Sequence, residues 1–325
     1  MGDLDTAQPR HAPEELEEHR VELTGYCYRM LGSVFEAEDA VQDTLVRAWR
    51  GLDRFEGRSA LRSWLYHIAT NVCFDLLKGR QRRAHPIDLG PASTADSPLG
   101  PPLAETSWVE PMPDARALPG GGDPAEQAVS RETVRLAFVA ALQHLPPRQR
   151  AVLILREVLR WKASEVAVLL ETSAASVNSA LQRARATLGE RGVTASDPVR
   201  PMDAAQRALV GRYVDAFERY DLDSLVSLLH EEATQSMPPF DLWLRGPGQL
   251  RAWWSGPGIE CRGSRLLPVA ANSSPAFGQY RPSGPGGRHE PFALQVLELS
   301  GDRIIGITSF LDPRLFPLFG LPAYL

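Results

Sequence analysis

The stretch EDAVQDTLVRAW, residues 38–49, decides how the first part of the chain folds. Its apolar side chains recur at the spacing of one face of an α-helix, at Val41, Leu45, Ala48 and Trp49, with Leu52 beyond them. The opposite face carries polar side chains: Asp39, Gln42, Asp43, Arg47 and Arg50. The pattern predicts an amphipathic helix. Taken alone, its polar face also fits an ordinary solvated helix with an Asp43–Arg47 ion pair.

A second helix is predicted after the loop 55–58, with Ser59 as its N-cap. Its apolar stripe consists of Leu61, Leu65, Ile68, Ala69, Val72 and Leu76. A different face displays Trp64, His67, Asn71, Asp75 and Lys78, and the helix runs out into Arg80, Arg82 and Arg83. An aromatic ring, an amide and a basic end on one face suit unstacked bases and phosphates. The alternative is that Trp64 packs into a core and the basic end is merely solvated.

These two helices carry a resemblance. Residues 38–49 followed by RSWLYHIATN, residues 62–71, resemble region 2 of the extracytoplasmic-function (ECF) sigma factors, which bind core RNA polymerase and recognise promoters. The resemblance implies that Asp39, Gln42 and Asp43 contact the polymerase. It also implies that the 55–59 loop captures a flipped base of the −10 element. The expected −10 contacts are Phe55, Arg58, Ser59, Trp64, Asn71, Asp75, Lys78, Arg80, Arg82 and Arg83.

Residues 86–124 have a different composition. Nine of the 27 prolines of the chain fall there, together with the run Gly120-Gly121-Gly122, so this segment is predicted to be a linker. It is acidic, because its six carboxylates face a single base, Arg116. In related sigma factors such a linker threads the RNA-exit path of the polymerase.

Residues 163–181 fit a helix-turn-helix in which Thr172-Ser173 form the turn and Ser173 caps the second helix. Asn and Gln side chains pair with adenine edges, and Arg pairs with guanine or phosphate, when such a helix enters a major groove. A plain helical hairpin with a polar outer face is the alternative. The exposed face is predicted to present Ser173, Ala174, Ser176, Asn178, Ser179, Gln182, Arg183 and Arg185.

This segment resembles sigma region 4, which reads the −35 element. Two departures from the family pattern bear on that expectation. Glu171 stands where the turn often has Gly, and Ala180 and Asn178 replace basic residues that are common in the recognition helix. They leave open which −35 sequence is read.

The C-terminal third is predicted to contain helices at 203–220 and 222–229 and then strands, notably 292–299 and 303–310, joined by a Gly301-Asp302 hairpin turn. This order, two helices and then curved antiparallel strands, resembles the SnoaL-like (nuclear-transport-factor-like) cone fold that a subset of ECF sigma factors carries. The stretches 235–239, 253–254 and 272–277 are similar to that subset. The predicted architecture is two all-α sigma domains, a region 2 helical bundle and a region 4 helix-turn-helix, plus an α+β SnoaL-like domain.

Such a cone suits a ligand or a catalytic pair. Free-standing relatives include cyclases with an Asp/His acid–base pair, but His230, Asp241, His289 and Asp312 do not have a convincing spacing. We therefore expect no catalytic residue, and a packing, regulatory domain or a small-ligand sensor instead. The aromatic residues expected to line the cone are Phe240, Trp243, Trp253 and Trp254.

Two apolar islands lie in otherwise polar segments: Trp108 to Pro111 in the linker, and the tail 312–322. Both resemble motifs of related fused sigma factors, and the tail motif is one through which those proteins regulate themselves. The hypothesis is that the C-terminal domain contacts the linker and the sigma core. The alternative is that the tail merely closes its own cone. The residues expected to mediate this regulation are Trp108, Glu110, Pro111, Asp312, Pro313, Leu315 and Phe316.

The net charge of −5 is unusual for a DNA-binding protein that acts alone. The resemblance to sigma factors implies that the protein relies on the core enzyme for affinity, which would account for this charge. Cys27, Cys73 and Cys261 lack zinc spacing and are expected to be reduced thiols of a cytoplasmic protein. No metal, cofactor, membrane partner, signal peptide or spanning segment is expected.

The predicted division is region 2 at 14–85, the linker at 86–124, region 4 at 125–195 and the SnoaL-like domain at 200–325. The predicted function is promoter-specific transcription initiation with core RNA polymerase and promoter DNA, autoregulated by the C-terminal domain. One alternative is a ligand-responsive one-component DNA-binding regulator, which leaves the 38–49 and 59–83 patterns unexplained. Another is an enzyme with a DNA-binding appendage.

Overall fold

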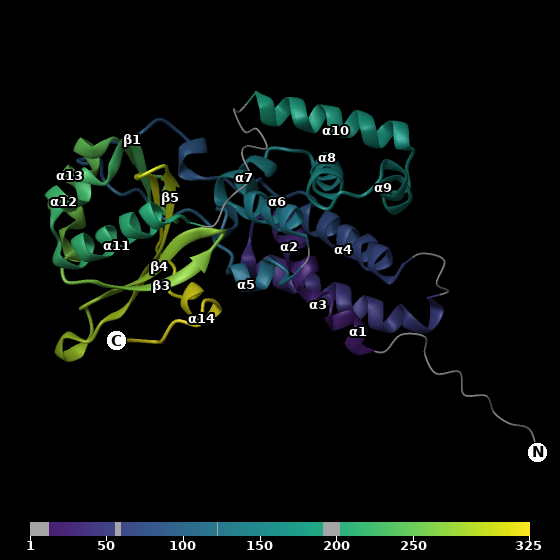
Figure 1. The fold of residues 1–325 in the computed structure, drawn as a ribbon, viewed down its shortest axis with the longest axis horizontal. Coiled ribbons are helices and arrows are strands. Elements are labelled where there is room, and N and C mark those ends of the chain that lie inside the picture. Colours follow the sequence, from purple (N-terminus) through teal and green to yellow (C-terminus); the bar gives the residue numbers. More distant parts are fainter. Residues whose placement is uncertain (1–12, 56–59, 122, 191–201) are drawn as a thin grey trace, which may run out of the picture. The chain divides into compact units, whose positions relative to one another are not determined.

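The computed structural model describes residues 13–55, 60–121, 123–190 and 202–325 (Figure 1). The chain packs into two units, and each unit combines two separate stretches of sequence. The helical unit consists of Met1–Arg80 and Ala115–Ser196, and the α/β unit consists of Gln81–Asp114 and Asp197–Leu325. Most of the predicted linker therefore packs with the C-terminal third of the chain.

The first half of the helical unit contains α1 (Pro13–Glu17), α2 (Arg20–Leu31), α3 (Val34–Gly51), a 3₁₀ turn (Leu52–Arg54) and α4 (Leu61–Leu77). Ser33 caps α3 by accepting a hydrogen bond from the Glu36 amide at 3.2 Å. Val41, Leu45 and Ala48 are buried, as the periodicity predicts, but Trp49 is 60% exposed. Trp49 was wrongly placed in the buried stripe, because the neighbouring helices do not cover that edge of it.

The second half contains α5 (Asp114–Ala117), α6 (Pro124–Val134), α7 (Leu136–Leu142), α8 (Pro147–Leu153), a π-helical turn (Ile154–Val158), α9 (Ala163–Leu169) and α10 (Ala174–Gly189). The pair α9–α10 confirms the predicted helix-turn-helix. Ser173 caps α10 by accepting from the Ser176 amide at 3.1 Å. Glu171 adopts the left-handed conformation, with φ of 50°, in which glycine is common.

Side chains that cap the C-terminal turns of helices join the two halves. Arg29 of α2 donates to Thr133 O in the last turn of α6 at 3.2 Å, and to Ser130 O one turn earlier at 2.9 Å. Arg150 of α8 donates to Met30 O near the end of α2, and His67 Nδ1 of α4 lies 2.9 Å from Leu169 O at the end of α9. Carbonyls in a last helical turn lack intrahelical partners, so these contacts satisfy groups that would otherwise be buried without one.

The α/β unit contains α11 (Ala204–Arg219), α12 (Leu222–Ser227) and α13 (Pro247–Ser255). Its strands are β1 (Leu229–Ser236), β2 (Trp243–Arg245), β3 (Arg265–Ala271), β4 (Ser274–Arg281), β5 (Glu290–Ser300) and β6 (Arg303–Phe310), and the short helix α14 (Leu315–Leu318) follows. They form one sheet in the order β2-β1-β6-β5-β4-β3. The predicted turn is confirmed, since Ser300 pairs with Arg303 and Gly301 has φ of 57°. The pair β1–β6 is parallel, whereas the strands were expected to be antiparallel.

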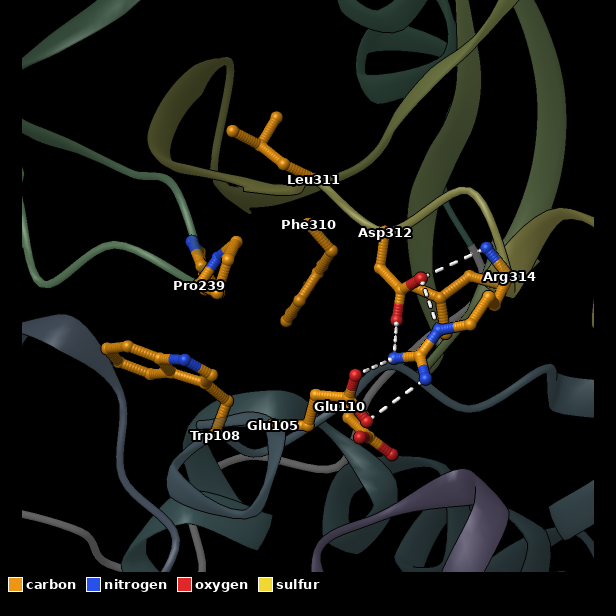
Figure 2. Close-up of a pocket in the computed structure, with 10 residues that line it drawn as sticks. Glu105, Trp108, Glu110, Pro239, Phe310, Leu311, Asp312 and Arg314 are labelled. Atoms are coloured by element: carbon orange, nitrogen blue, oxygen red, sulfur yellow. Dashed lines mark hydrogen bonds and ion pairs between the residues drawn. The ribbon is translucent and has the colours of Figure 1, made fainter. Parts of the chain in front are cut away.

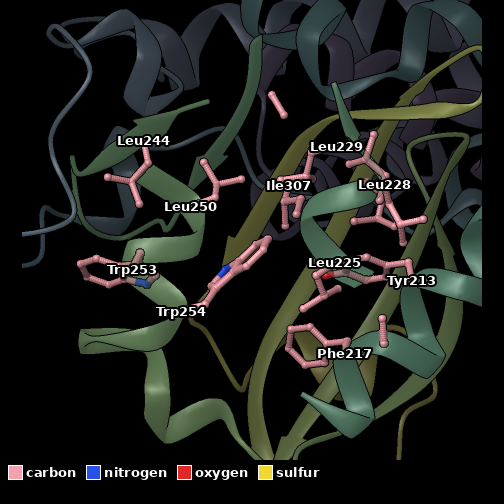
Figure 3. Packing of buried hydrophobic residues seen from close by; sticks show 14 of the residues in the cluster. Tyr213, Phe217, Leu225, Leu228, Leu229, Leu244, Leu250, Trp253, Trp254 and Ile307 are labelled. Carbon is pink, nitrogen blue, oxygen red and sulfur yellow. The ribbon is translucent and has the colours of Figure 1, made fainter. Parts of the chain in front are cut away.

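The core of the α/β unit lies between the sheet and the helices α11, α12 and α13 (Figure 3). Tyr213 and Phe217 of α11 and Trp253 and Trp254 of α13 are buried in it. Trp254 Nε1 donates to Gln235 Oε1 at 2.8 Å, so the indole is both packed and hydrogen-bonded. Large side chains fill this part of the fold.

Residues 81–114 are fixed to the α/β unit by backbone hydrogen bonds. The amides of Ser93 and Leu103 donate to Trp243 O and Pro239 O, each at 2.8 Å. Met112 and Asn272 exchange two hydrogen bonds, Met112 N to Asn272 Oδ1 at 2.8 Å and Asn272 N to Met112 O at 3.0 Å. The proline-rich composition predicted a linker. It could not predict this docking, because the hydrogen-bond partners of residues 81–114 lie far away in the sequence.

Cys27 and Cys73 are buried, and Cys261 is half-buried. Burial raises the pKa of the Cys73 thiol, which keeps it protonated and unreactive. In the parts of the chain that are described, no group of three or more His, Cys, Asp or Glu side chains could hold a metal ion. No helix in those parts combines the length and apolarity that crossing a membrane requires.

Candidate polymerase and nucleic-acid interfaces

The outer face of α3 carries the predicted polymerase contacts. Asp39 and Gln42 are exposed, and Asp43 is partly exposed. Asp43 Oδ2 lies 2.7 Å from Arg47 Nη2 one turn later. The buried side of α3 packs on α2 and α4, which fixes the orientation of the acidic face. Exposed carboxylates on a rigid helix can accept hydrogen bonds from a basic partner surface.

The predicted −10 face on α4 is partly exposed. The ring of Trp64 stacks on Phe55 with centroids 4.8 Å apart. Asn71 is exposed and its Nδ2 lies 3.2 Å from His67 Nε2. Asp75 and Lys78 form an exposed ion pair at 2.7 Å, and the hydrogen bond from Lys78 holds the pKa of Asp75 below its ordinary value. The face therefore offers aromatic, amide and charged groups to a partner.

The arginines that follow α4 are only partly exposed to solvent. Arg80 is exposed and pairs with Glu36, and Arg82 is exposed. Arg83 corrects the expectation of a DNA contact, because it is only 6% exposed and donates to Glu105 O at 2.8 Å and Trp108 O at 2.7 Å. Its guanidinium binds linker carbonyls and is not available to a phosphate. Two expected −10 residues, Arg58 and Ser59, lie outside the described residues.

His67 was expected on the same face as Trp64 and Asn71, but it turns towards α9. Beside it, the Arg62 guanidinium lies 5.3 Å from the ring centroid of Tyr66 and 5.6 Å from that of Trp161. Arg62 Nη2 also pairs with Glu22 at 2.8 Å. Trp161 and the end of α9 therefore pack directly on α4 within the helical unit.

The predicted −35 face lies along the outside of α10. Val177, Ala180, Leu181, Ala184 and Leu188 are buried on the opposite side. Arg185 pairs with Glu157 at 2.5 Å, and Arg183 is exposed. The exposed residues of this face are Ser173, Ala174, Ser176, Asn178, Ser179, Gln182, Arg183 and Arg185.

The expected regulatory residues come together within the α/β unit (Figure 2). Trp108 and Glu110 of the linker line one cavity together with Asp312 and Leu315. Pro111 is buried, Pro313 is exposed, and Phe316 packs edge-on against Tyr280 with centroids 5.1 Å apart.

Sequence reasoning missed the residue that ties these two segments together. Arg314 Nη2 lies 2.8 Å from a Glu105 oxygen and 2.7 Å from Asp312 Oδ2 (Figure 2). Glu105 lies 209 positions away from Arg314 in the sequence, so no local pattern indicates the pairing.

The candidate acid–base residues of the C-terminal third are not assembled into a site. His289 Nε2 contacts Gly263 O at 2.9 Å, His230 Nδ1 accepts from Glu232 N, and Asp312 pairs with Arg314. Buried polar groups form a hydrogen-bonded chain instead, in which Tyr213 donates to Gln295 at 2.8 Å and Gln295 to Gln279 at 2.8 Å. A satisfied network of this kind stabilises the core.

Comparisons with known proteins identify three domains in this chain. Models of sigma-70 region 2, sigma-70 region 4 and the SnoaL-like domain match residues 16–83, 135–188 and 210–306. The ECF RNA polymerase sigma factor SigG of Mycobacterium tuberculosis is 46% identical over 309 residues, which cover 94% of this chain and 82% of SigG. SigJ of the same organism is 30% identical over 221 residues, or 68% of this chain and 62% of SigJ.

The fold is also found in a solved structure. The crystal structure of Mycobacterium tuberculosis SigJ matches with a TM-score of 0.60 at 23% identity and covers 95% of this chain and 98% of that one. Region 2, region 4 and their order along the chain define a sigma-70-type transcription initiation factor. Given its identity to SigG over most of both chains, this chain belongs to the ECF family of RNA polymerase sigma factors, with a C-terminal SnoaL-like domain. Proteins of this family bind core RNA polymerase and promoter DNA and are not enzymes.

Proposed function

We propose that Asp39, Gln42 and Asp43 are the surface through which this sigma factor binds core RNA polymerase. One observation supports this proposal most strongly: α3 presents these three side chains outward while its other face is buried in the helical unit. The same proposal assigns the −10 element to the exposed face of α4 and the −35 element to the exposed face of α10. Since both partners are cytoplasmic, the protein acts in the cytoplasm.

The four-part division at 14–85, 86–124, 125–195 and 200–325 belongs to the same proposal. The first part docks on the polymerase and melts the promoter, and the second links the two sigma regions. The third part reads the −35 element, and the fourth regulates transcription. In the structure most of the linking part packs with the regulatory part. The proposal thus gives the linker two alternative positions: the one on the α/β unit, and a second one along the polymerase in the holoenzyme.

Promoter binding requires the helical unit to open. The −10 and −35 elements are about 25 base pairs apart, or roughly 85 Å at 3.4 Å per base pair. His67 of α4 contacts Leu169 of α9 at 2.9 Å, so regions 2 and 4 are in direct contact here. We infer that core polymerase separates α4 from α9 when the holoenzyme forms.

Arg183→Ala is expected to lower run-off transcription from a cognate promoter about tenfold, because one base-reading side chain contributes about 1–3 kcal/mol of discrimination. The measurement is run-off transcription with core polymerase and the full chain. Arg212→Ala, a change at an arginine of α11 that is exposed in the α/β unit, is the control and leaves transcription unchanged. Equal transcription by Arg183→Ala and the parent chain on every template would contradict a reading role for this face.

The second part of the proposal concerns regulation. The α/β unit holds residues 81–114 through hydrogen bonds and through burial of Trp108, Val109 and Met112. A linker held in this way is withheld from the RNA-exit path of the polymerase. Docking of the linker therefore restrains transcription, and undocking activates it.

Asn272→Gly is expected to weaken this docking about tenfold and to raise run-off transcription. The glycine tolerates the φ of 53° but removes the oxygen that accepts from the Met112 amide, which leaves a buried donor without a partner. Limited proteolysis of residues 84–114 reports the undocking.

Ser273→Gly is the matched control. Ser273 is the next residue, it has a nearly equal φ of 54°, and its buried hydroxyl has no hydrogen-bond partner among the described residues. This change is expected to alter neither proteolysis nor transcription. If Asn272→Gly undocks the linker without raising transcription, the restraint is not exerted through the linker.

A further inference from the structure

A cavity of about 180 Å³ lies in the α/β unit where the linker meets the end of β6 (Figure 2). Linker residues 105–110 form one wall, and the turn at Pro238-Pro239 and residues 310–315 form the others. A cavity of roughly 150 Å³ with apolar walls is large enough to bind benzene. This one therefore has room for a single ring.

Most of the lining is apolar. Phe310 and Leu315 are buried, and the rings of Pro238 and Pro239 complete the wall. In Figure 2 the indole of Trp108 faces Pro239 and Phe310 across the cavity. Such a surface favours binding of a flat, apolar molecule.

One residue of the lining, Trp108, carries a buried polar group. The side chain is 3% exposed, and its Nε1 is buried with no hydrogen-bond partner among the described residues. Native proteins pair nearly all buried donors, because an unpaired one costs about as much as a lost hydrogen bond. The donor requires an acceptor, and the cavity that Trp108 lines is where a bound molecule can supply it.

The charges on the rim disfavour an anionic molecule. Three carboxylates, of Glu105, Glu110 and Asp312, line the cavity together with one guanidinium, of Arg314. Arg314 is already bound to Glu105 and Asp312, and Glu110 lies 3.8 Å from Arg83. An excess of negative charge repels an anion, and the cation on the rim is not available to compensate.

We propose that this cavity binds a neutral, single-ring molecule whose hydrogen-bond acceptor pairs with the Trp108 indole. Because the linker forms one wall and the SnoaL-like domain the others, the bound molecule holds the linker in its docked position. This regulatory consequence rests on the proposed function above, whereas the binding itself does not.

Three probes of nearly equal shape test the binding: acetophenone, isopropylbenzene and benzoate. Their binding to the full-length chain is followed by titration, with ¹⁵N-labelled tryptophan reporting each indole N–H. Acetophenone, which carries the acceptor, is expected to bind about tenfold more tightly than isopropylbenzene and benzoate, and to shift the Trp108 indole resonance. A simple apolar pocket gives the opposite order, because isopropylbenzene is the more hydrophobic.

Trp108→Phe keeps a ring but removes the donor, so it is expected to abolish the preference for acetophenone. Trp254→Phe is the matched control, since that indole is also buried but donates to Gln235 outside the cavity, and it retains the preference. Equal or reversed affinities of acetophenone and isopropylbenzene for the parent chain overturn the proposal even if a variant fails to fold. An unshifted Trp108 resonance also overturns it.

The regulatory consequence has its own readout. At a concentration ten times the dissociation constant, acetophenone is expected to slow proteolysis of residues 84–114 about tenfold. If proteolysis is unchanged with acetophenone bound, the proposed effect on the linker is wrong, but the binding site is still supported. Failure of Asn272→Gly to raise transcription removes the proposed restraint and leaves both binding results standing.

Discussion

Replacing Arg150 by methionine is expected to destabilise the helical unit by about 3–4 kcal/mol. Arg150 is 3% exposed, donates to Met30 O and binds Gln143 Oε1 at 2.6 Å and Leu145 O at 3.1 Å. Burial lowers the pKa of its guanidinium to about 10, so it stays charged at neutral pH. Methionine fills much of the same space but leaves these buried acceptors without a donor.

Hydrogen exchange of the full chain measures this effect unit by unit, because protection reports local opening. Peptides from α2 and α8 are expected to lose protection in Arg150→Met, while peptides from β5 keep theirs. Arg148→Met is the matched control on the same helix, since Arg148 is exposed and donates to Leu170 O from the protein surface. Similar losses in the two variants would show that the buried hydrogen bonds of Arg150 contribute little.

Combined Asp39→Lys and Asp43→Lys substitution is expected to reduce binding to core RNA polymerase at least 100-fold and run-off transcription to background. Placing like charges against each other across an interface costs several kcal/mol. The substitution also breaks the Asp43–Arg47 ion pair, but an exposed pair of this kind contributes at most about 1 kcal/mol. The fold should therefore survive while the interface fails.

The control must carry the same change in net charge. Asp215→Lys combined with Asp302→Lys changes two exposed aspartates of the α/β unit, and it is expected to leave polymerase binding unchanged. Titration of labelled chain with core polymerase measures the affinities, and thermal unfolding verifies the fold. Equal losses in both double variants would assign the effect to net charge and not to the α3 face.

Local patterns predicted much of the secondary structure, because their physical causes are local. Ser173 caps α10 from the adjacent position, and Gly301 adopts the positive φ of the hairpin turn it was expected to make. Glu171 adopts the left-handed conformation without being glycine, so the departure from the family pattern did not prevent the turn. These features depend on residues within a few positions of each other.

The predictions that failed depend on distant partners. Arg83 has the composition of a phosphate contact, but carbonyls 22 and 25 residues later bind it. The burial of Arg29 and Arg150 follows from helix ends that lie 101 to 120 positions away. Periodicity indicates which face of a helix is apolar, but not which charged side chain another helix end will bury. The proposed polymerase and promoter surfaces were predicted from motif resemblance, whereas the cavity beside Trp108 could be found only in the structure.

The docked linker also contacts both edge strands of the six-stranded sheet. At one margin the Ser93 amide binds Trp243 O of β2, and at the other Pro113 bridges to Ala271 of β3. Edge strands with unpaired backbone groups are templates for pairing with a second polypeptide. If the linker is released as proposed, sites for strand-to-strand assembly with other copies are uncovered. Rapid capture of the released state by polymerase would limit such assembly.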